Sequence, residues 1–140
     1  MPNWLLYALI SAFFAALTAV FAKVGLKEVN SDLATAIRTG IILFITWGIV
    51  FLKGNAGGID NLSKNNWIFL TLSAVATGLS WLFYYKALQI GKVSEVSAID
   101  KGSIVFTILL SLLFLREPIT PKLLMGAAFI IAGMLIIVWK

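Results

Sequence analysis

Four ionisable residues stand inside apolar stretches of this chain, where a charge is costly and therefore marks a functional candidate. They are Arg38, Lys86, Asp100 and Lys101. The long stems of Arg38 and Lys86 can carry their charges to the lipid headgroups, so for these two a surface role stays open beside a binding role. The short side chain of Asp100 needs a cationic partner such as Arg38, Lys86 or Lys101. Its neighbour Lys101 is the least expected partner, because adjacent positions on a helix diverge. The excess of embedded cations favours a ligand with a carboxylate or another anionic group.

Polar and aromatic side chains accompany these charges. After Asp100, hydroxyl residues at spacings of three and four predict a polar stripe on one helix face, namely Ser103, Thr107 and Ser111. Hydrogen bonding between packed helices or to the preceding turn explains such a stripe as well as a substrate path does. Aromatic residues in membrane helices more often pack or anchor than bind a ligand. The candidate substrate-binding residues are Arg38, Trp81, Tyr84, Tyr85, Lys86, Asp100, Lys101, Ser103, Thr107 and Ser111.

These candidates are carried by five apolar stretches, each near the length of about 20 residues that crosses a hydrocarbon core. The stretches cover approximately residues 4–22, 33–52, 67–90, 96–115 and 123–139. With 61% hydrophobic and 12% charged residues, the sequence predicts an all-α, polytopic membrane protein with a single domain over residues 1–140. The lipid bilayer is therefore its first partner. An odd number of spans places the two termini on opposite sides of the membrane.

Capping residues predict where three of the helices begin. Asn30 is expected to cap the second helix and Asn66 the third. Thr120, followed by Pro121, is expected to cap the fifth.

The loop charges do not orient the chain. On the side of the N-terminus lie Lys53, Lys64, Arg116 and Lys122, and on the opposite side lie Lys23, Lys27, Lys92 and Lys140. This tie predicts that both orientations are accessible, whereas counting the embedded cations as well favours a cytoplasmic C-terminal side. The net charge of +5 is explained by contact with anionic headgroups, so no nucleic-acid partner is expected.

Enzymatic chemistry finds little support in the sequence. The chain contains neither Cys nor His, which removes thiolate and imidazole ligands and the usual proton shuttle. It has no phosphate-cradling Gly-Lys-Ser loop and no paired embedded carboxylates. We therefore expect no catalytic residue, no metal and no cofactor.

Residues 85–133 carry a series of short motifs. They are Ala87-Leu88-Gln89 with Gly91, Ser103-Ile104-Val105-Phe106-Thr107, Leu109-Leu110-Ser111, Phe114-Leu115-Arg116-Glu117, Thr120, Lys122, Gly126 and Gly133. On these motifs the chain resembles the EamA family of the drug/metabolite transporter superfamily. The run Ile99-Asp100-Lys101 before Ser103 is similar to the short five-helix bacterial and archaeal transporters of that superfamily.

The resemblance implies a transporter in which two five-helix units of opposite orientation enclose a central site, and it implies export of amino acids or related metabolites. This chain supplies one unit, so we expect it to work by alternating access as an antiparallel homodimer in the cell membrane of a bacterium or archaeon. The first helix lacks the embedded Glu of the small multidrug pumps, so their drug/proton exchange is not expected. Two alternatives stay open: a half-transporter with a different inverted subunit, and a non-transporting scaffold or accessory subunit of a larger membrane complex.

Overall fold

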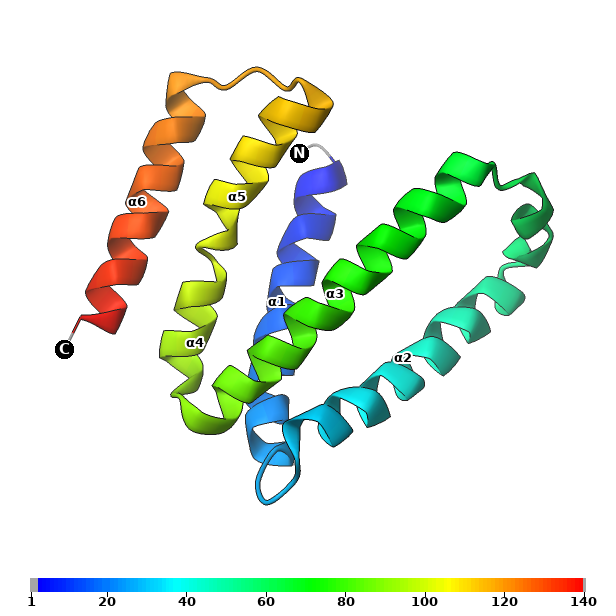
Figure 1. Ribbon diagram of the computed structural model, residues 1–140, viewed down its shortest axis with the longest axis horizontal. Coiled ribbons are helices and arrows are strands. Elements are labelled where there is room, and N and C mark those ends of the chain that lie inside the picture. Colours follow the sequence, from blue (N-terminus) through cyan, green and yellow to red (C-terminus); the bar gives the residue numbers. More distant parts are fainter. Residues whose placement is uncertain (1–2, 140) are drawn as a thin grey trace. The chain divides into compact units, whose positions relative to one another are not determined.

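A computed structural model describes residues 3–139 of the chain, and all the elements in that part are helices (Figure 1). They are α1 (Asn3–Gly25), α2 (Ser31–Leu52), the 3-10 helix η1 (Asn55–Asn61), α3 (Lys64–Ile90), α4 (Val93–Asp100), α5 (Ser103–Leu110), the π-helix η2 (Ser111–Leu115) and α6 (Pro121–Val138). Five spans are long and apolar enough to cross a membrane, with α4, α5 and η2 together forming the fourth. The predicted all-α polytopic fold is therefore confirmed. Lys140, which entered the charge comparison, lies outside the described residues.

Side-chain oxygens cap two helices as the sequence predicts. The Oδ1 atom of Asn30 accepts a hydrogen bond from the amide of Asp32 at 2.9 Å, which fixes the start of α2. The Oγ1 atom of Thr120 accepts one from the amide of Leu123 at 3.2 Å, and Pro121 takes the first position of α6.

The predicted cap of α3 is wrong. The helix begins at Lys64, so Asn66 is already its third residue. The Oγ atom of Ser63 accepts a hydrogen bond from the Asn66 amide at 3.2 Å, and the Ser63 hydroxyl donates to the Asn66 side chain. Ser63, which immediately precedes the helix, therefore supplies the capping oxygen to the amide of the third helical residue.

The chain packs as two units, which are described separately. The α2–α3 unit comprises residues 22–89, and the α4–α6 unit comprises the described residues up to 21 and from 90 onward. In the α2–α3 unit the two long helices run antiparallel and are joined by η1 (Figure 1). Its small core contains Leu26, Ser31, Thr35, Tyr85 and Leu88, all of them buried. The core therefore lies where α2 begins and α3 ends.

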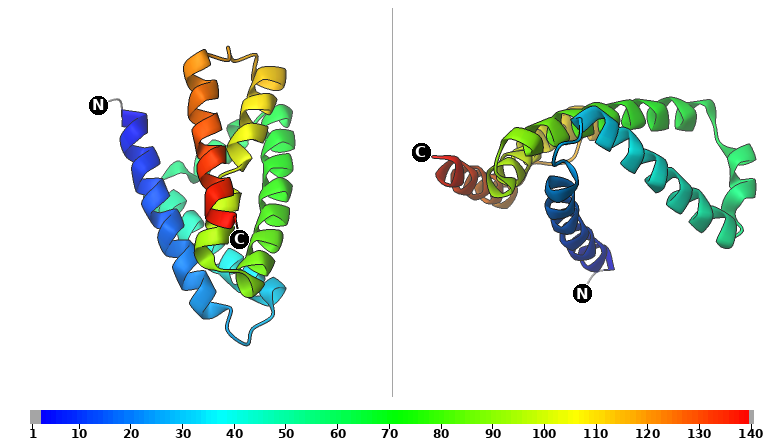
Figure 2. Two further views of the ribbon diagram at one scale, coloured as in Figure 1. Left: turned by 90° about the vertical axis from the view of Figure 1, so that its left-hand side faces the viewer. Right: turned by 90° about the horizontal axis from the view of Figure 1, so that it is seen from below.

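In the α4–α6 unit, α6 returns antiparallel to α4 and α5, and α4 contacts α6 (Figures 1 and 2). The fourth span was expected to be one continuous helix, but it is interrupted between Asp100 and Ser103. At the interruption the amide of Lys101 bonds to the carbonyl of Ala98 at 3.1 Å, and the amide of Gly102 bonds to that of Ile99 at 2.8 Å. Bonds to the third preceding residue tighten the helix into a 3-10 turn.

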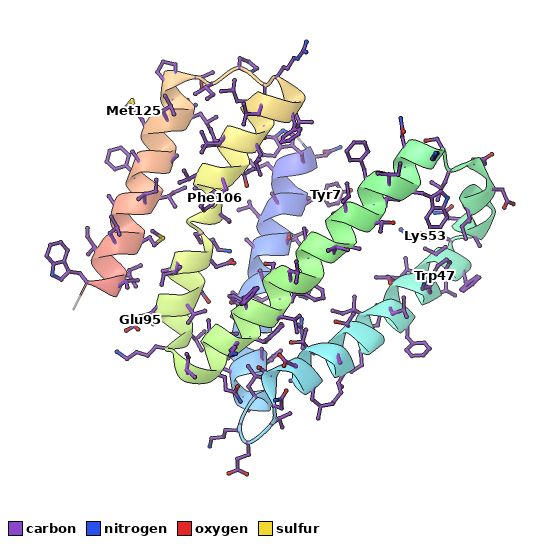
Figure 3. The ribbon with its side chains drawn as sticks, viewed as in Figure 1. Tyr7, Trp47, Lys53, Glu95, Phe106 and Met125 are labelled. Atoms are coloured by element: carbon purple, nitrogen blue, oxygen red, sulfur yellow. The ribbon has the colours of Figure 1, made fainter. Side chains whose placement is uncertain are left out.

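Most large apolar side chains of the described residues are exposed. Tyr7, Phe106 and Met125 are 70%, 69% and 62% exposed and extend away from their helices (Figure 3). An apolar surface on this scale marks contact with lipid or with another membrane helix.

Candidate functional site

The embedded Arg38 of α2 lies against two aromatic rings of α3. Its Cζ atom is 4.6 Å from the ring centroid of Tyr85 and 5.4 Å from that of Trp81. Both distances are within the range in which a guanidinium is attracted to the face of an aromatic ring. Tyr85 in turn packs edge-on against Tyr84, with centroids 5.7 Å apart and an angle of 77° between the rings. We call Arg38, Trp81 and Tyr85 the arginine–aromatic cluster.

The depth of Arg38 separates it from an ordinary surface arginine. The second span runs from Ser31 to Leu52, so at 1.5 Å per residue Arg38 lies about 5 Å from its middle. Its Nη1 atom is buried and makes no hydrogen bond within residues 3–139. The two ion pairs in the described part of the chain join other residues. The guanidinium therefore keeps at least one hydrogen-bond donor that residues 3–139 leave unsatisfied, which is costly at this depth.

The remaining candidates of α3 divide into two groups. Tyr84 supports the cluster through its contact with Tyr85. Lys86 is exposed and makes no hydrogen bond or ion pair with other described residues, as expected of a lysine that extends toward the headgroups. The sequence thus identified every member of the arginine–aromatic cluster, together with one residue that the structure does not join to it.

A clasp between the end of α1 and the end of α3 was not foreseen. The Nζ atom of Lys23 donates to the carbonyl of Leu88 at 2.6 Å and to that of Gln89 at 3.3 Å. The side-chain amide of Gln89 donates to the carbonyl of Val29 at 2.8 Å. A cation on the last carbonyls of a helix satisfies acceptors that have no intrahelical partner and complements the helix dipole. Lys23 was counted as a loop charge, although a basic residue in the last turn of a helix is a known capping signal.

The second group of candidates lies in the α4–α6 unit, around the interruption of the fourth span. Asp100 Oδ2 and Lys101 Nζ form an ion pair at 3.2 Å. The expectation that these neighbours would diverge was wrong, because α4 ends at Asp100 and the long stem of Lys101 can turn back beyond that end. Their side chains are 42% and 64% exposed, respectively.

The hydroxyl stripe continues from this ion pair along α5. Ser103 and Thr107 are exposed, and Ser111 is half-buried at the start of η2. The hydroxyl of Thr107 donates to the carbonyl of Ser103 at 3.0 Å. This is the bond to the preceding turn that was one of the two explanations of the stripe.

Five apolar spans, one of them carrying an embedded cation against two aromatic rings, are features of a multi-pass membrane protein. The chain belongs to the EamA-like transporter family, whose family model matches residues 2–139. It is 46% identical over 135 residues to a protein of Sinorhizobium sp. described as an uncharacterized transporter in the cobO 3′ region, and the match covers 96% of each chain. No solved structure matches. The resemblance inferred from residues 85–133 is thereby confirmed, and it extends over nearly the whole chain.

Proposed function

We propose that the protein is a secondary transporter of a small metabolite that carries a carboxylate or another anionic group, and that Arg38 is the residue that anchors this group. The observation that supports the proposal is the buried Nη1 atom of Arg38, which has no hydrogen-bond partner within residues 3–139. A carboxylate can accept two parallel hydrogen bonds from one guanidinium. An anionic ligand would therefore satisfy the donor and neutralise the embedded charge in one step.

The aromatic rings suit this ligand in a second way. The Cζ atom of Arg38 lies over the rings of Trp81 and Tyr85, at 5.4 and 4.6 Å from their centroids. Aromatic rings attract the charge of a guanidinium without taking up its N–H donors in ordinary hydrogen bonds, so the donors of the half-buried Arg38 remain for a ligand. Amino acids and related metabolites, which the family resemblance implies as substrates, carry the required carboxylate.

Transport by alternating access requires two bundles that move about a shared site, and one five-span chain supplies one bundle. We infer that the second bundle is an inverted copy of the same chain and that the physiological direction is export. The tie in loop charges supports this arrangement, because it leaves the chain free to insert in both orientations.

Substrate class is tested on purified protein and in proteoliposomes. Amino acids and organic acids should raise the melting temperature, and one of them should move across the membrane in reconstituted vesicles. Cationic drugs should do neither. Stabilisation by cationic drugs combined with indifference to every acid tested would contradict the proposal.

Orientation is tested by sidedness labelling of single cysteines at Lys27 and Gly57, which lie beyond opposite ends of α2. The absence of native cysteine makes the background clean. Labelling of each position from both faces of the membrane supports the antiparallel homodimer. One fixed orientation excludes it, and vesicle transport then separates a half-transporter that needs a different subunit from a non-transporting scaffold.

A further inference from the structure

The interruption of the fourth span lies close to the middle of the membrane. The span runs from Val93 to Leu115, so at 1.5 Å per residue Asp100 lies about 6 Å and Lys101 about 5 Å from its centre. Both residues are charged, and at this depth their side chains are substantially exposed. Charged groups at such a depth avoid lipid and face protein or a water-filled cavity.

The local packing keeps the pair uncovered within its own unit. Gly102 lies against α6, since a Cβ atom added to it would stand 3.1 Å from Met134 Sδ and 3.0 Å from the carbonyl oxygen of Ile99. The backbone of the interruption is thus packed on α6, whereas the side chains of Asp100 and Lys101 remain 42% and 64% exposed. The exposed Ser103 and Thr107 continue this polar surface along α5.

We propose that this surface is covered by a second, inverted copy of the chain, and that Asp100 of each copy pairs with the partner's Lys101. The inference rests on the proposed antiparallel homodimer and specifies where its two copies meet. A two-fold axis in the membrane plane brings residues near the middle of a span close to the same residues of the partner. Under such an axis a contact of Asp100 with the partner's Lys101 is formed twice, so one negative and one positive charge on each copy can satisfy those of the other.

The depths permit the contact. Asp100 of one copy and the partner's Lys101 lie on opposite sides of the midplane, separated along the membrane normal by about 10 Å between their backbones. The stem of a lysine and the side chain of an aspartate can together bridge that separation. In the dimer each charge then has two partners of opposite sign, one in its own chain and one in the other copy.

The test uses co-expression of two differently tagged full-length chains, with recovery of doubly tagged dimers in mild detergent as the readout. Asp100→Ala in both chains leaves two lysines unpaired, and Lys101→Ala in both leaves two aspartates unpaired. Each should lower recovery at least about tenfold, as expected of a close charge pair at an interface. Asp100→Ala in one chain with Lys101→Ala in the other leaves one complete pair between the copies. This mixed dimer should return to within about threefold of the wild-type recovery.

Several outcomes overturn the proposal. If the mixed combination is as poorly recovered as the matched ones, the pair acts within one chain. If Asp100→Ala and Lys101→Ala leave recovery unchanged, the surface is not the interface. Helical circular dichroism of each variant controls for folding, and Asp100→Asn provides a second charge-removing variant of similar shape. Lys92→Ala and Glu95→Ala, which break an ion pair of 3.0 Å at the start of α4, serve as matched controls and should not change recovery. Because the readout needs no substrate, a failure to observe transport would leave this result interpretable.

Discussion

Replacing Arg38 by Met should weaken ligand binding strongly and change the stability of the unliganded protein little. Binding and stability are affected differently because the guanidinium contributes more to ligand binding than to the stability of the fold. Its Nη1 atom is buried without a hydrogen-bond partner in the described part of the chain. A residue whose main purpose is stability would not leave a donor unsatisfied at that depth.

The magnitudes follow from the contacts of Arg38. Its two ring contacts, at 4.6 and 5.4 Å, are worth about 0.5–2 kcal/mol each. Removing a buried donor that lacks a partner returns about 1–3 kcal/mol, and a Met side chain keeps much of the apolar packing. These terms nearly cancel, so the melting temperature without ligand should move by no more than about 5 °C. A hydrogen bond to a charged group contributes about 1.5–3 kcal/mol, so binding of a carboxylate should weaken about 10- to 100-fold.

The assay is isothermal titration of the purified protein with the best acid from the substrate screen, combined with thermal unfolding in the absence of ligand. Arg38→Lys keeps the charge but loses planar, two-bond recognition, and it should fall between the wild type and Arg38→Met. Arg116→Met removes the other arginine of the chain, which lies outside the five spans, and should bind normally. Binding by Arg38→Met within about threefold of the wild type would refute the assignment of Arg38 as the anchor. A fall in melting temperature of more than about 10 °C would refute the separation of binding from stability.

Three further predictions concern the elements that hold the site in place. Lys23→Met should lower the free energy of unfolding by about 1–3 kcal/mol, because the last carbonyls of α3 lose their donor. Lys23→Arg should keep most of the wild-type stability. Equal melting curves for the three proteins would contradict the contact between Lys23 and α3. Gly102→Ala should destabilise by about 1–2 kcal/mol in the same assay, because crowding of the added Cβ atom against the Ile99 carbonyl oxygen and Met134 Sδ outweighs the gain in helix propensity. Combining it with Met134→Ala should reduce the destabilisation caused by Gly102→Ala. If the two losses in free energy of unfolding are strictly additive, the added Cβ atom is not strained against Met134. Thr120→Ala should lower the free energy of unfolding, measured by chemical denaturation, by about 1 kcal/mol through loss of the α6 cap. Thr120→Ser should leave it unchanged. An Ala variant as stable as the wild type would show that Pro121 alone fixes the start of α6.

The five spans could be predicted because a membrane helix is visible in sequence as a long uninterrupted apolar run. The helix ends were less predictable, since polar residues outside the run extend the helix. Lys64 begins α3 three residues before Trp67, where the apolar pattern starts, because Ser63 supplies a cap. As N-cap residues, Ser63 and Asn66 are about equally favourable in sequence. Which of them caps the helix depends on where the backbone becomes helical.

The interruption of the fourth span could not be predicted with the same certainty. A single glycine within a helical pattern is usually tolerated, so Gly102 gave only a weak signal. Its environment is set by Met134, which lies 32 residues further along the chain and contacts it only after folding. The pairing of Asp100 with Lys101 depends on this interruption and was therefore also missed.

For the arginine–aromatic cluster, the members could be predicted from the sequence but their contact could not. Arg38, Trp81 and Tyr85 could each be nominated because charge and aromaticity are visible in sequence. Their mutual contact could not, because more than forty residues separate Arg38 from the rings. The clasp of Lys23 was harder still, since its partners are backbone carbonyls, which have no signature in sequence.

The separation of 65 residues between Lys23 and Leu88 has a consequence for the timing of biosynthesis. A chain that grows at about 5–20 residues per second makes the carbonyl of Leu88 about 3–13 s after Lys23. Throughout that interval α1, joined by α2 once residues 31–52 have been made, lacks the contact that ties its end to α3. The first two spans must therefore enter the bilayer on their own apolar character, and the end of α1 is fixed to α3 only when the third span has been synthesised.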